Sequence, residues 1–313
     1  MVYIIVLLIS VVCSIILRKV FINLKIIDKI NHRSSHTAIA TRTGGIVIFS
    51  TIFLYSTYLY FIGFQPYDFS ILIPISILFA TGLYDDVYHV DFGLKFIFQI
   101  IAAKLLVDMG VVIDIFSIFG IEYSFTRTLT QLISIFIYVA IFNAYNFIDG
   151  IDLNIILETV KSMIIMMFLF NYSDDLMKLM IIIIIILISI IPFNINKKTK
   201  VFMGDSGSLI IPVILIFFIN QGVVFSEDKN ILKYLALIFI YPILDLLRVA
   251  IIRIKKGASP FKADKNHLHH IINRITNNHI KSSLIIFSSS LIIQLILILI
   301  FFNKFIGCLS KSC

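Results

Sequence analysis

The chain has 313 residues, of which 59% are hydrophobic and only 14% are charged. Soluble domains carry about 25% charged residues, so this composition excludes a water-soluble protein with a polar surface and indicates a protein embedded in a lipid bilayer. The formal net charge of +8 would favour a nucleic-acid partner in a soluble protein, but in a membrane protein basic residues set orientation, and we predict no nucleic-acid binding.

Long apolar stretches run through the whole chain. A spanning helix needs about 20 apolar residues to cross about 30 Å of hydrocarbon, and lipid offers no partner for backbone polar groups. The sequence therefore predicts an all-α fold, a polytopic transmembrane helical bundle that forms one domain over residues 1–313. We predict ten spans, at residues 2–17, 44–63, 69–83, 93–107, 129–145, 153–170, 177–191, 207–221, 234–252 and 283–303.

Two of these spans have an alternative interpretation. Residues 2–17 have no charged segment before them and no small-residue cleavage site after them, which predicts a retained span rather than a signal peptide. The fourth span carries Lys95 and Lys104, so an interfacial or tilted helix is the alternative there.

Basic residues are distributed unevenly between the loops. The odd-numbered loops hold 17 Lys and Arg residues, and the even-numbered loops with the C-terminal tail hold 6. Because cytoplasmic loops carry the excess of Lys and Arg, this count predicts that the odd loops face the cytoplasm and that both termini lie outside. Most of the unusual aspartates fall on the same odd loops, so we expect the chemistry on one cytoplasmic face.

The first loop, residues 28–45, reads DKINHRSSHTAIATRTGG. A basic loop beside a membrane often serves only as an orientation signal. Here Asp28, Arg33, His36 and Arg42 alternate with Asn, Ser and Thr and end at Gly44-Gly45, which indicates an ordered turn.

The segment GLYDDV places Asp85 and Asp86 directly after a span. Two adjacent carboxylates beside hydrocarbon are unfavourable unless a cation, hydrogen bonds or water meet them. A solvated loop start is the simpler interpretation, and the other polar clusters argue against it.

The segment NAYNFIDGID places Asn143, Asn146, Asp149 and Asp152 at intervals of three residues. On a helix this spacing predicts one polar stripe. Asparagine also joins helices within membranes. Four such groups in ten residues indicate more than helix association.

The segment VFMGDSGSL sets Asp205 between Gly204 and Ser206-Gly207, just before a span. Asp and Ser are common helix N-caps, which need no further function. The flanking glycines, the helix N-terminus and the carboxylate also suit a phosphate or a Mg²⁺ ion, and the two interpretations are compatible.

The segment DKNHLHH places His267, His269 and His270 in the last odd loop, near several basic residues. Zinc sites favour His at i and i+4 or Cys partners, and this spacing has neither. The three cysteines, Cys13, Cys308 and Cys313, also lack ligand spacing. Donors that face phosphate oxygens are the better interpretation. Together the clusters predict metal-assisted phosphoryl chemistry on a lipid.

Five segments, in this order, resemble those of the polyprenyl-phosphate N-acetylhexosamine-1-phosphate transferases. They cover nearly the whole chain: the loop at 28–45, GLYDDV, NAYNFIDGID, VFMGDSGSL and SPFKADKNHLHH. The ending HLHH after SPFKAD is similar to the branch that uses UDP-N-acetylglucosamine. One departure is Leu153, which follows Asp152 where the family usually has glycine.

The resemblance implies a role for each matching residue. It implies catalytic roles for Asp85, Asp86, Asp149, Asp152 and His269, substrate binding by Asn146, Phe202, Lys95, Arg42, His267 and His270, and Mg²⁺ binding by Asp205, with Mn²⁺ as the alternative ion. Phe202 matches an aromatic that stacks on uracil. Asp85 matches a carboxylate proposed as base or nucleophile, and we favour an orienting or proton-accepting role in a single displacement, since a lipid phosphate is already anionic.

The reaction implied by the resemblance is transfer of N-acetylglucosamine-1-phosphate from a UDP-sugar to undecaprenyl phosphate, which releases UMP. This is the first membrane step of a bacterial surface polysaccharide, such as the O-antigen of lipopolysaccharide, in the bacterial plasma (inner) membrane. Another UDP-N-acetylhexosamine, peptidoglycan lipid synthesis and homodimer formation stay open. An ion-coupled transporter is the alternative of another class, because acids at span edges also mark ion paths.

Overall fold

The computed structural model describes residues 2–28, 39–114, 116–118, 121–123, 125–226, 229–259 and 265–301. The expectations for Arg33 and His36 in the first loop and for the SPFKAD segment from Pro260 to Asp264 lie outside these residues. The C-terminal tail after residue 301 lies outside them as well.

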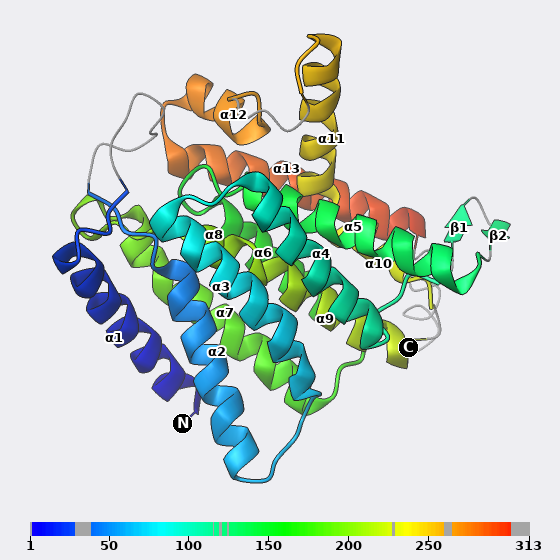
Figure 1. Cartoon of the computed structure of the whole chain (residues 1–313), viewed down its shortest axis with the longest axis horizontal. Helices are drawn as coiled ribbons and strands as arrows, with labels where there is room; N and C mark the ends of the chain where they lie inside the picture. Colours follow the sequence, from blue (N-terminus) through cyan, green and yellow to red (C-terminus); the bar gives the residue numbers. More distant parts are fainter. Residues whose placement is uncertain are drawn as a thin grey trace, which may run out of the picture.

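Helices make up nearly all of the described chain (Figure 1). In chain order the elements are α1 (Val2–Asn23), α2 (Gly44–Phe61), the 3-10 helix η1 (Phe69–Ile71), α3 (Leu72–Tyr88), α4 (Phe92–Asp108), β1 (Phe116–Ile118), β2 (Ile121–Tyr123), α5 (Arg127–Phe147), α6 (Asn154–Leu169), α7 (Asp174–Ile195), the 3-10 helix η2 (Lys197–Thr199), α8 (Asp205–Ser208), α9 (Ile210–Phe225), α10 (Ile231–Ile238), α11 (Ile240–Lys255), α12 (Leu268–Thr276) and α13 (His279–Phe301). Each of the ten predicted spans overlaps at least one helix, so the helical bundle is confirmed. The short antiparallel pair β1–β2 is an addition that the apolar pattern did not predict.

Seven helical segments of the described chain are long and apolar enough to cross a membrane: Val2–Asn23, Gly44–Phe61, Phe69–Tyr88, Arg127–Phe147, Asp174–Ile195, Asp205–Phe225 and His279–Phe301. An eighth is obtained if α10 and α11 count as one span bent by 76°. The other two predicted spans fall on α4, with 17 residues, and α6, with 16. The membrane-protein prediction therefore holds, whereas the number of ten spans stays a prediction.

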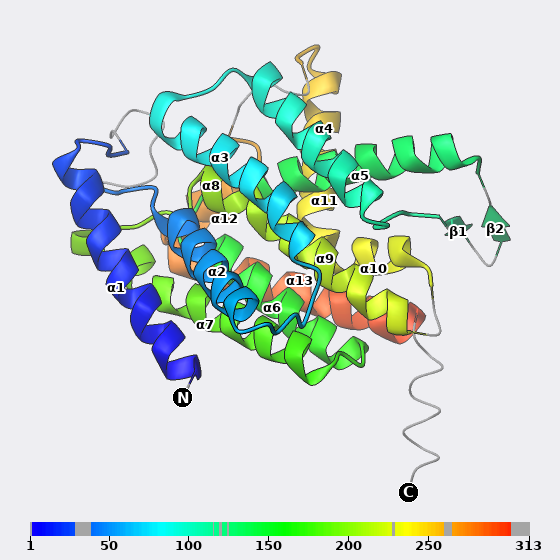
Figure 2. The ribbon, with the colours of Figure 1, turned by 60° about the horizontal axis from the view of Figure 1, so that its bottom comes forward.

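The segment α8–α9 forms the centre of the bundle. Within the most apolar window of Asp205–Phe225, 78% of the residues are buried, against 22% for α1 and 17% for α13. Helices α3, α5, α6 and α10 all contact α9, and Figure 2 shows α9 inside the bundle and α1 at its edge. The isoleucines, leucines and phenylalanines of α9 thus form part of the protein core. Helices α1 and α13 expose most of their apolar side chains, as expected for a surface that faces lipid.

Polar side chains join α13 to the elements beside it. On α6, Lys161 Nζ donates to Glu158 Oε2 at 2.6 Å and to Ser290 Oγ of α13 at 2.5 Å. Gln294 Nε2 donates to the carbonyl oxygens of Leu237 and Ile238 at 3.1 and 3.3 Å, where α10 ends. Carbonyls at a helix end lack partners within the helix, so Gln294 satisfies them and supports the bend between α10 and α11.

Candidate active site

The site begins where two loops pair side by side. Thr41 N donates to Lys200 O at 3.2 Å, and Phe202 N donates to Thr41 O at 2.8 Å. Gly44 N then donates to Phe202 O at 2.9 Å. Gly44 and Gly45 are the first two residues of α2, so the prediction of an ordered turn was wrong for the glycine pair, and residues 29–38 of the same loop lie outside the described residues. This pairing brings the start of α2 against the start of α8.

Asp86 ties the end of α3 to the start of α8. Its Oδ1 accepts from Asp205 N at 2.9 Å and its Oδ2 from Ser206 N at 3.0 Å, while Arg42 Nη1 lies 3.6 Å from Oδ1. The Asp86 side chain is fully buried. Close packing supports this arrangement, since a Cβ at Gly82 would collide with the Asp205 backbone. These contacts give Asp86 a structural role, and its catalytic role stays a prediction.

Asp85 and Asp205 form the accessible part of the site. Both contact Lys95: the ammonium lies 3.6 Å from Asp85 Oδ2 and forms a short ion pair with Asp205 Oδ2. Asp85 Oδ1 also accepts from Val90 N at 2.7 Å. The three side chains are 17%, 23% and 13% exposed for Asp85, Asp205 and Lys95, in contrast to Asp86. Helix α4 supplies Lys95 from its first turn, which Asp91 caps by accepting from Gly93 N at 2.8 Å.

Arg42 is the second cation of the site. It donates to Asp28 Oδ1 at 2.8 Å. Burial alone would lower the pKa of Arg42, but the carboxylates of Asp28, Asp86 and Asp205 outweigh burial and raise that pKa. Arg42 therefore stays charged at every accessible pH. It offers a fixed positive charge beside the accessible carboxylates.

The predicted polar stripe of the NAYNFIDGID segment is only partly present. Helix α5 ends at Phe147, so the residues that follow leave the helical spacing. Asn143 Nδ2 donates to Gln99 Oε1 of α4 at 2.7 Å, and Asn146 Nδ2 donates to Ser208 Oγ of α8 at 2.7 Å. Asn143 joins two helices, whereas Asn146 faces the site. The prediction of one polar stripe of four residues was therefore wrong, because α5 ends before Asp149 and Asp152.

Asp149 lies in the turn after α5. Burial raises its pKa well above the ordinary value, and the negative charges of Asp205 and Asp86 raise it further. Burial and the two neighbouring acids therefore disfavour the charged form of Asp149. This excess of negative charge is the kind of environment that attracts a cation or a basic group.

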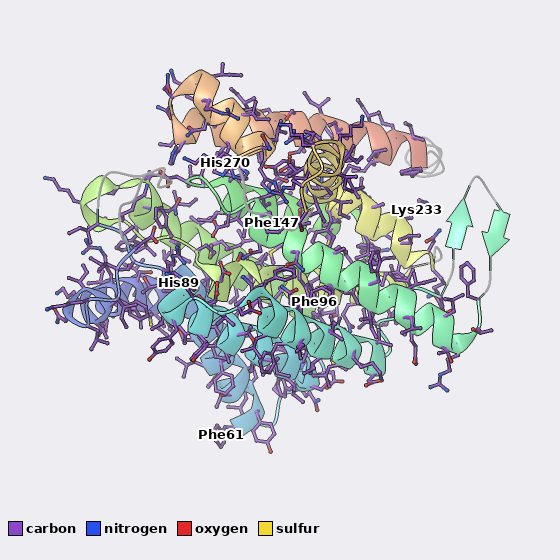
Figure 3. The ribbon with its side chains drawn as sticks, turned by 45° about the horizontal axis from the view of Figure 1, so that its top comes forward. Phe61, His89, Phe96, Phe147, Lys233 and His270 are labelled. Carbon is purple, nitrogen blue, oxygen red and sulfur yellow. The ribbon has the colours of Figure 1, made fainter. Side chains whose placement is uncertain are left out.

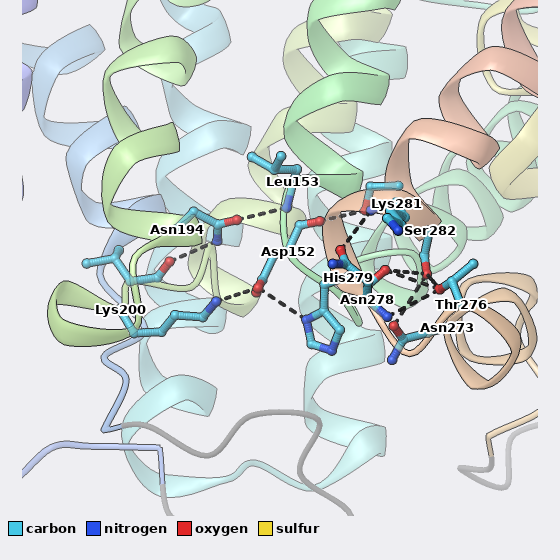
Figure 4. A network of polar contacts seen from close by, with 12 residues as sticks. Asp152, Leu153, Asn194, Lys200, Asn273, Thr276, Asn278, His279, Lys281 and Ser282 are labelled. Atoms are coloured by element: carbon cyan, nitrogen blue, oxygen red, sulfur yellow. Dashed lines mark hydrogen bonds and ion pairs between the residues drawn. The ribbon is translucent and has the colours of Figure 1, made fainter.

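Asp152 belongs to a separate network (Figure 4). It forms a short ion pair with Lys200 and lies 3.2 Å from His279 Nδ1, and its carbonyl accepts from Ser283 Oγ at 2.6 Å. Burial would raise the pKa of Asp152, but the hydrogen bonds from His279 and Lys200 lower it. We name Asp152, Lys200 and His279 the Asp152 network. Its contacts are structural, and the catalytic role of Asp152 stays a prediction.

The departure from the family at Leu153 coincides with an unusual backbone conformation. Leu153 has φ +66°, the left-handed region that glycine adopts freely. Its amide donates to Asn194 Oδ1 at 2.8 Å, and Asn194 Nδ2 donates to Val201 O at 2.9 Å. Asn194 therefore holds Leu153 in this conformation and joins it to the loop before α8.

His269 packs its ring directly onto Gly150. A Cβ at Gly150 would collide with the His269 ring, so only glycine allows this contact. His269 is 1% exposed, and neither ring nitrogen has a hydrogen-bond partner among the described residues. Burial, with help from His270 and His267, lowers the pKa of His269 well below its usual range. Burial and then His267 lower the pKa of His270 to about 4. Both rings are therefore neutral near pH 7.

His267 is held by an acid that the sequence reasoning missed. His267 Nδ1 lies 2.9 Å from Asp245 Oδ2 on α11. Asp245 and Arg248 were part of a predicted span, where a buried acid followed by a basic residue one turn later is itself a signal of function. Figure 3 shows His270 on α12 and Phe147 at the end of α5, and the rings of Phe147 and His267 are 5.2 Å apart between centroids.

The remaining predicted residue, Phe202, lies on the loop before α8. It is half-buried, and Lys200 Nζ lies 5.6 Å from the centre of its ring. The five predicted clusters therefore meet at one end of the bundle. In Figure 3, His89 lies at that end of the α2–α3 pair and Phe61 at the opposite end. Six of the predicted residues come together directly: Asp85, Asp86, Lys95, Arg42, Asn146 and Asp205. We name His267, His269 and His270, at the start of α12, the histidine turn, and its His269 contacts Gly150. Asp152 stands apart in its own network.

Comparison with known proteins gives the class of this chain. The sequence model of the family described as glycosyl transferase family 4 matches residues 68–222. The decaprenyl-phosphate N-acetylglucosaminephosphotransferase of Mycobacterium tuberculosis (strain H37Rv) is 30% identical over 292 residues, which cover 82% of this chain and 70% of the relative. The undecaprenyl-phosphate alpha-N-acetylglucosaminyl 1-phosphate transferases of Salmonella typhi and Escherichia coli K12 are 27% and 28% identical over 271 and 278 residues, covering 82% of this chain and 71% of each relative. The chain belongs to the polyprenyl-phosphate N-acetylhexosamine-1-phosphate transferase family.

Proposed function

We propose that the protein transfers N-acetylglucosamine-1-phosphate from UDP-N-acetylglucosamine to undecaprenyl phosphate. The observation that carries this proposal is the pair of carboxylates, Asp85 and Asp205, that share the Lys95 ammonium beside Arg42. The names of the relatives in Salmonella typhi and Mycobacterium tuberculosis support both the sugar phosphate and a polyprenyl phosphate acceptor.

The proposed reaction is a single displacement. A phosphate oxygen of the lipid attacks the β-phosphorus of the UDP-sugar, a new P–O bond forms, and the bond from that phosphorus to the bridging oxygen breaks. UMP leaves with the bond electrons, and the lipid keeps the sugar diphosphate. Lys95 and Arg42 bind phosphate oxygens and orient them in line. Asp85 orients the attacking phosphate or accepts its residual proton, while Asp86 holds the start of α8 in place.

We also propose that Asp205 binds Mg²⁺ during the reaction, with Mn²⁺ as the alternative. Among the residues the structure describes, no group of three His, Cys, Asp or Glu side chains could hold a metal ion by itself. Mg²⁺ suits this donor set because it keeps several waters and needs only one or two carboxylates together with substrate phosphates. Burial first, and then the negative charges of Asp205 and Asp86, raise the pKa of Asp149, so several acids lie close to Asp205. When bound, the ion would neutralise charge on the diphosphate.

Location and context belong to the same proposal. We propose that the site faces the cytoplasm from the bacterial plasma (inner) membrane. The site residues belong to the odd loops, which hold 17 Lys and Arg residues against 6 in the even loops and the C-terminal tail, and cytoplasmic loops carry the excess of basic residues. The product then starts a surface polysaccharide, such as the O-antigen of lipopolysaccharide or a cell-wall polymer. Homodimer formation stays a prediction.

One assay tests the activity. Purified protein in nanodiscs is incubated with Mg²⁺, a UDP-sugar and either undecaprenyl or decaprenyl phosphate, and both UMP release and the mass of the lipid product are measured. We expect UMP only when lipid phosphate is present, with a product mass that corresponds to N-acetylglucosamine. Another sugar in the product would correct the donor. Uptake of solute into vesicles without any UMP would favour the transporter instead.

A further inference from the structure

Asp245 occupies an unusual position for an acid. It lies on α11, in the second half of the bent pair, and is 3% exposed. Its Oδ2 lies 2.9 Å from His267 Nδ1, and its Oδ1 accepts from Leu268 N at 3.0 Å and from Arg248 Nη2 at 2.7 Å. One buried carboxylate thus contacts the histidine ring, the first amide of α12 and a cation. Neither the proposed displacement nor the Asp152 network uses it.

These contacts fix the orientation of the His267 ring. A carboxylate that accepts hydrogen bonds from Leu268 and Arg248 is ionised, so Nδ1 of His267 carries the hydrogen between the two groups. Nε2 then points to the opposite side of the ring, where Arg253 Nη2 lies 3.5 Å away. Arg248 also donates to the carbonyl of Asn266 at 2.5 Å, so the backbone before the histidine is held by the same pair.

The orientation of His267 extends to its neighbours. The rings of His267 and His269 are nearly parallel, with an interplanar angle of 14° and centroids 5.8 Å apart. The ring of His269 in turn packs on Gly150, next to Asp149. Helix α11 is therefore connected through two histidines, His267 and His269, to the turn that follows α5.

We propose that Asp245 is a positioning residue that fixes the ring of His267 before substrate binds, so that Nε2 of His267 and the guanidinium of Arg253 face the phosphates of the sugar nucleotide together. This inference rests on the proposed transferase function and deepens it. Asp245 acts only through the histidine turn, and it does not touch the reacting atoms.

A double-mutant cycle tests this proposal. UMP release is measured for the parent, Asp245→Asn, His267→Gln and the double variant, each purified in nanodiscs and checked for monodisperse size. Carboxylates that orient functional histidines contribute roughly 10- to 100-fold, so we expect Asp245→Asn to lower kcat/KM by that factor. In the His267→Gln background the same change should have an effect of less than about twofold, because the group it positions is gone.

A second variant covers the case in which Asp245→Asn does not fold. Asp245→Glu keeps the charge beside Arg248 and moves the carboxylate by one methylene, so it should lower kcat/KM in the parent and leave the His267→Gln protein unchanged. The matched control is Glu158→Gln, a buried acid of α6 that contacts Lys161 and Ser290 instead of the histidine turn. Any loss from Glu158→Gln should multiply with the loss from His267→Gln.

The outcomes separate the two proposals. If the losses from Asp245 and His267 variants also multiply, Asp245 does not act through His267 and the positioning role is wrong, although the transferase function stands. If the parent itself releases no UMP with any UDP-sugar, the proposed function fails first.

Discussion

Two clusters of this protein are built from the same residue types and have different consequences. At the accessible site, two acids, Asp85 and Asp205, share one lysine, and the Asp205 side chain is 23% exposed. In the Asp152 network one acid has two basic partners, and the Asp152 side chain is 10% exposed. The first cluster has more acids than lysines and is partly open to solvent, so it is suited to the proposed binding of a diphosphate together with a metal ion. In the second cluster two basic partners surround one more deeply buried acid, so we expect it to stabilise the fold, and the catalytic role of Asp152 stays a prediction. The comparison teaches that charge balance and access, more than residue type, separate chemistry from scaffolding.

The largest expected effect comes from Asp205→Asn, which removes the accessible carboxylate. We expect kcat for UMP release to fall about 10²- to 10³-fold, the usual loss for one preorganised charge contact, with the melting temperature nearly unchanged. The matched control is Asp175→Asn, which also removes an acid with a lysine partner from the first turn of a helix, in this case α7. Near-normal turnover of Asp205→Asn would contradict the proposed metal ligand. It would also contradict the distinction between an accessible catalytic cluster and the Asp152 network.

The Asp152 network should give the opposite pattern. Lys200→Met removes the ion pair of the buried Asp152 carboxylate and leaves only His279 beside Oδ2, so we expect a loss of about 1–3 kcal/mol in the free energy of unfolding and little change in kcat per folded molecule. Thermal unfolding in detergent and UMP release measure the two effects. Lys104→Met, which removes an exposed lysine paired with Asp108, is the control and should cost far less. A large loss of kcat without a loss of stability would place Lys200 in the chemistry.

Acid should destabilise the histidine turn. The pKa of His270 is lowered to about 4 from an ordinary 6.5, so between these values the unfolded chain binds more protons than the folded protein, and stability falls as the pH drops from 6.5 towards 4. His269 acts in the same direction. We expect the melting temperature to fall between pH 7 and pH 5, and to fall less in His270→Gln. An equal fall in both proteins would contradict the contribution of His270.

The smallest effect is expected at the helix interface formed by Asn143. Its hydrogen bond to Gln99 joins α5 and α4 one helical turn from Asn146 and Lys95, and such bonds in membrane proteins contribute about 0.6 kcal/mol on average. Asn143→Ala should therefore lower stability by about that amount and leave UMP release within about twofold. The same substitution at Asn146, which contacts Ser208 beside Asp205, should reduce activity instead. Equal losses of activity at Asn143 and Asn146 would contradict the assignment of Asn143 to a helix interface and of Asn146 to the site.

Much of the fold follows from local sequence, because apolar runs identify helices, although the number of them that span the membrane stays a prediction. All ten predicted spans fall on helices, and the polar clusters meet at one end of the bundle, whereas the cytoplasmic side that the loop parity predicts for them stays a prediction. Partners are less predictable, since they depend on contacts between distant segments. In the sequence, Lys200 is one of many basic loop residues and no motif marks His279, yet both contact Asp152 in the structure. Asp245 was overlooked inside an apolar span, although its charge there was the available signal. The predicted polar stripe was wrong because α5 ends at Phe147, and the spacing of polar residues does not reveal where a helix ends.

The position of α13 in the chain has a consequence for biosynthesis. Its residues His279, Ser283 and Gln294 contact Asp152 and the break between α10 and α11, all of which precede it in the sequence. Before this helix is inserted, Asp152 has Lys200 but lacks His279 and Ser283, and the carbonyl oxygens of Leu237 and Ile238 lack Gln294. The Asp152 network and the capped end of α10 are therefore completed only after the last helix of the described chain has been synthesised and inserted.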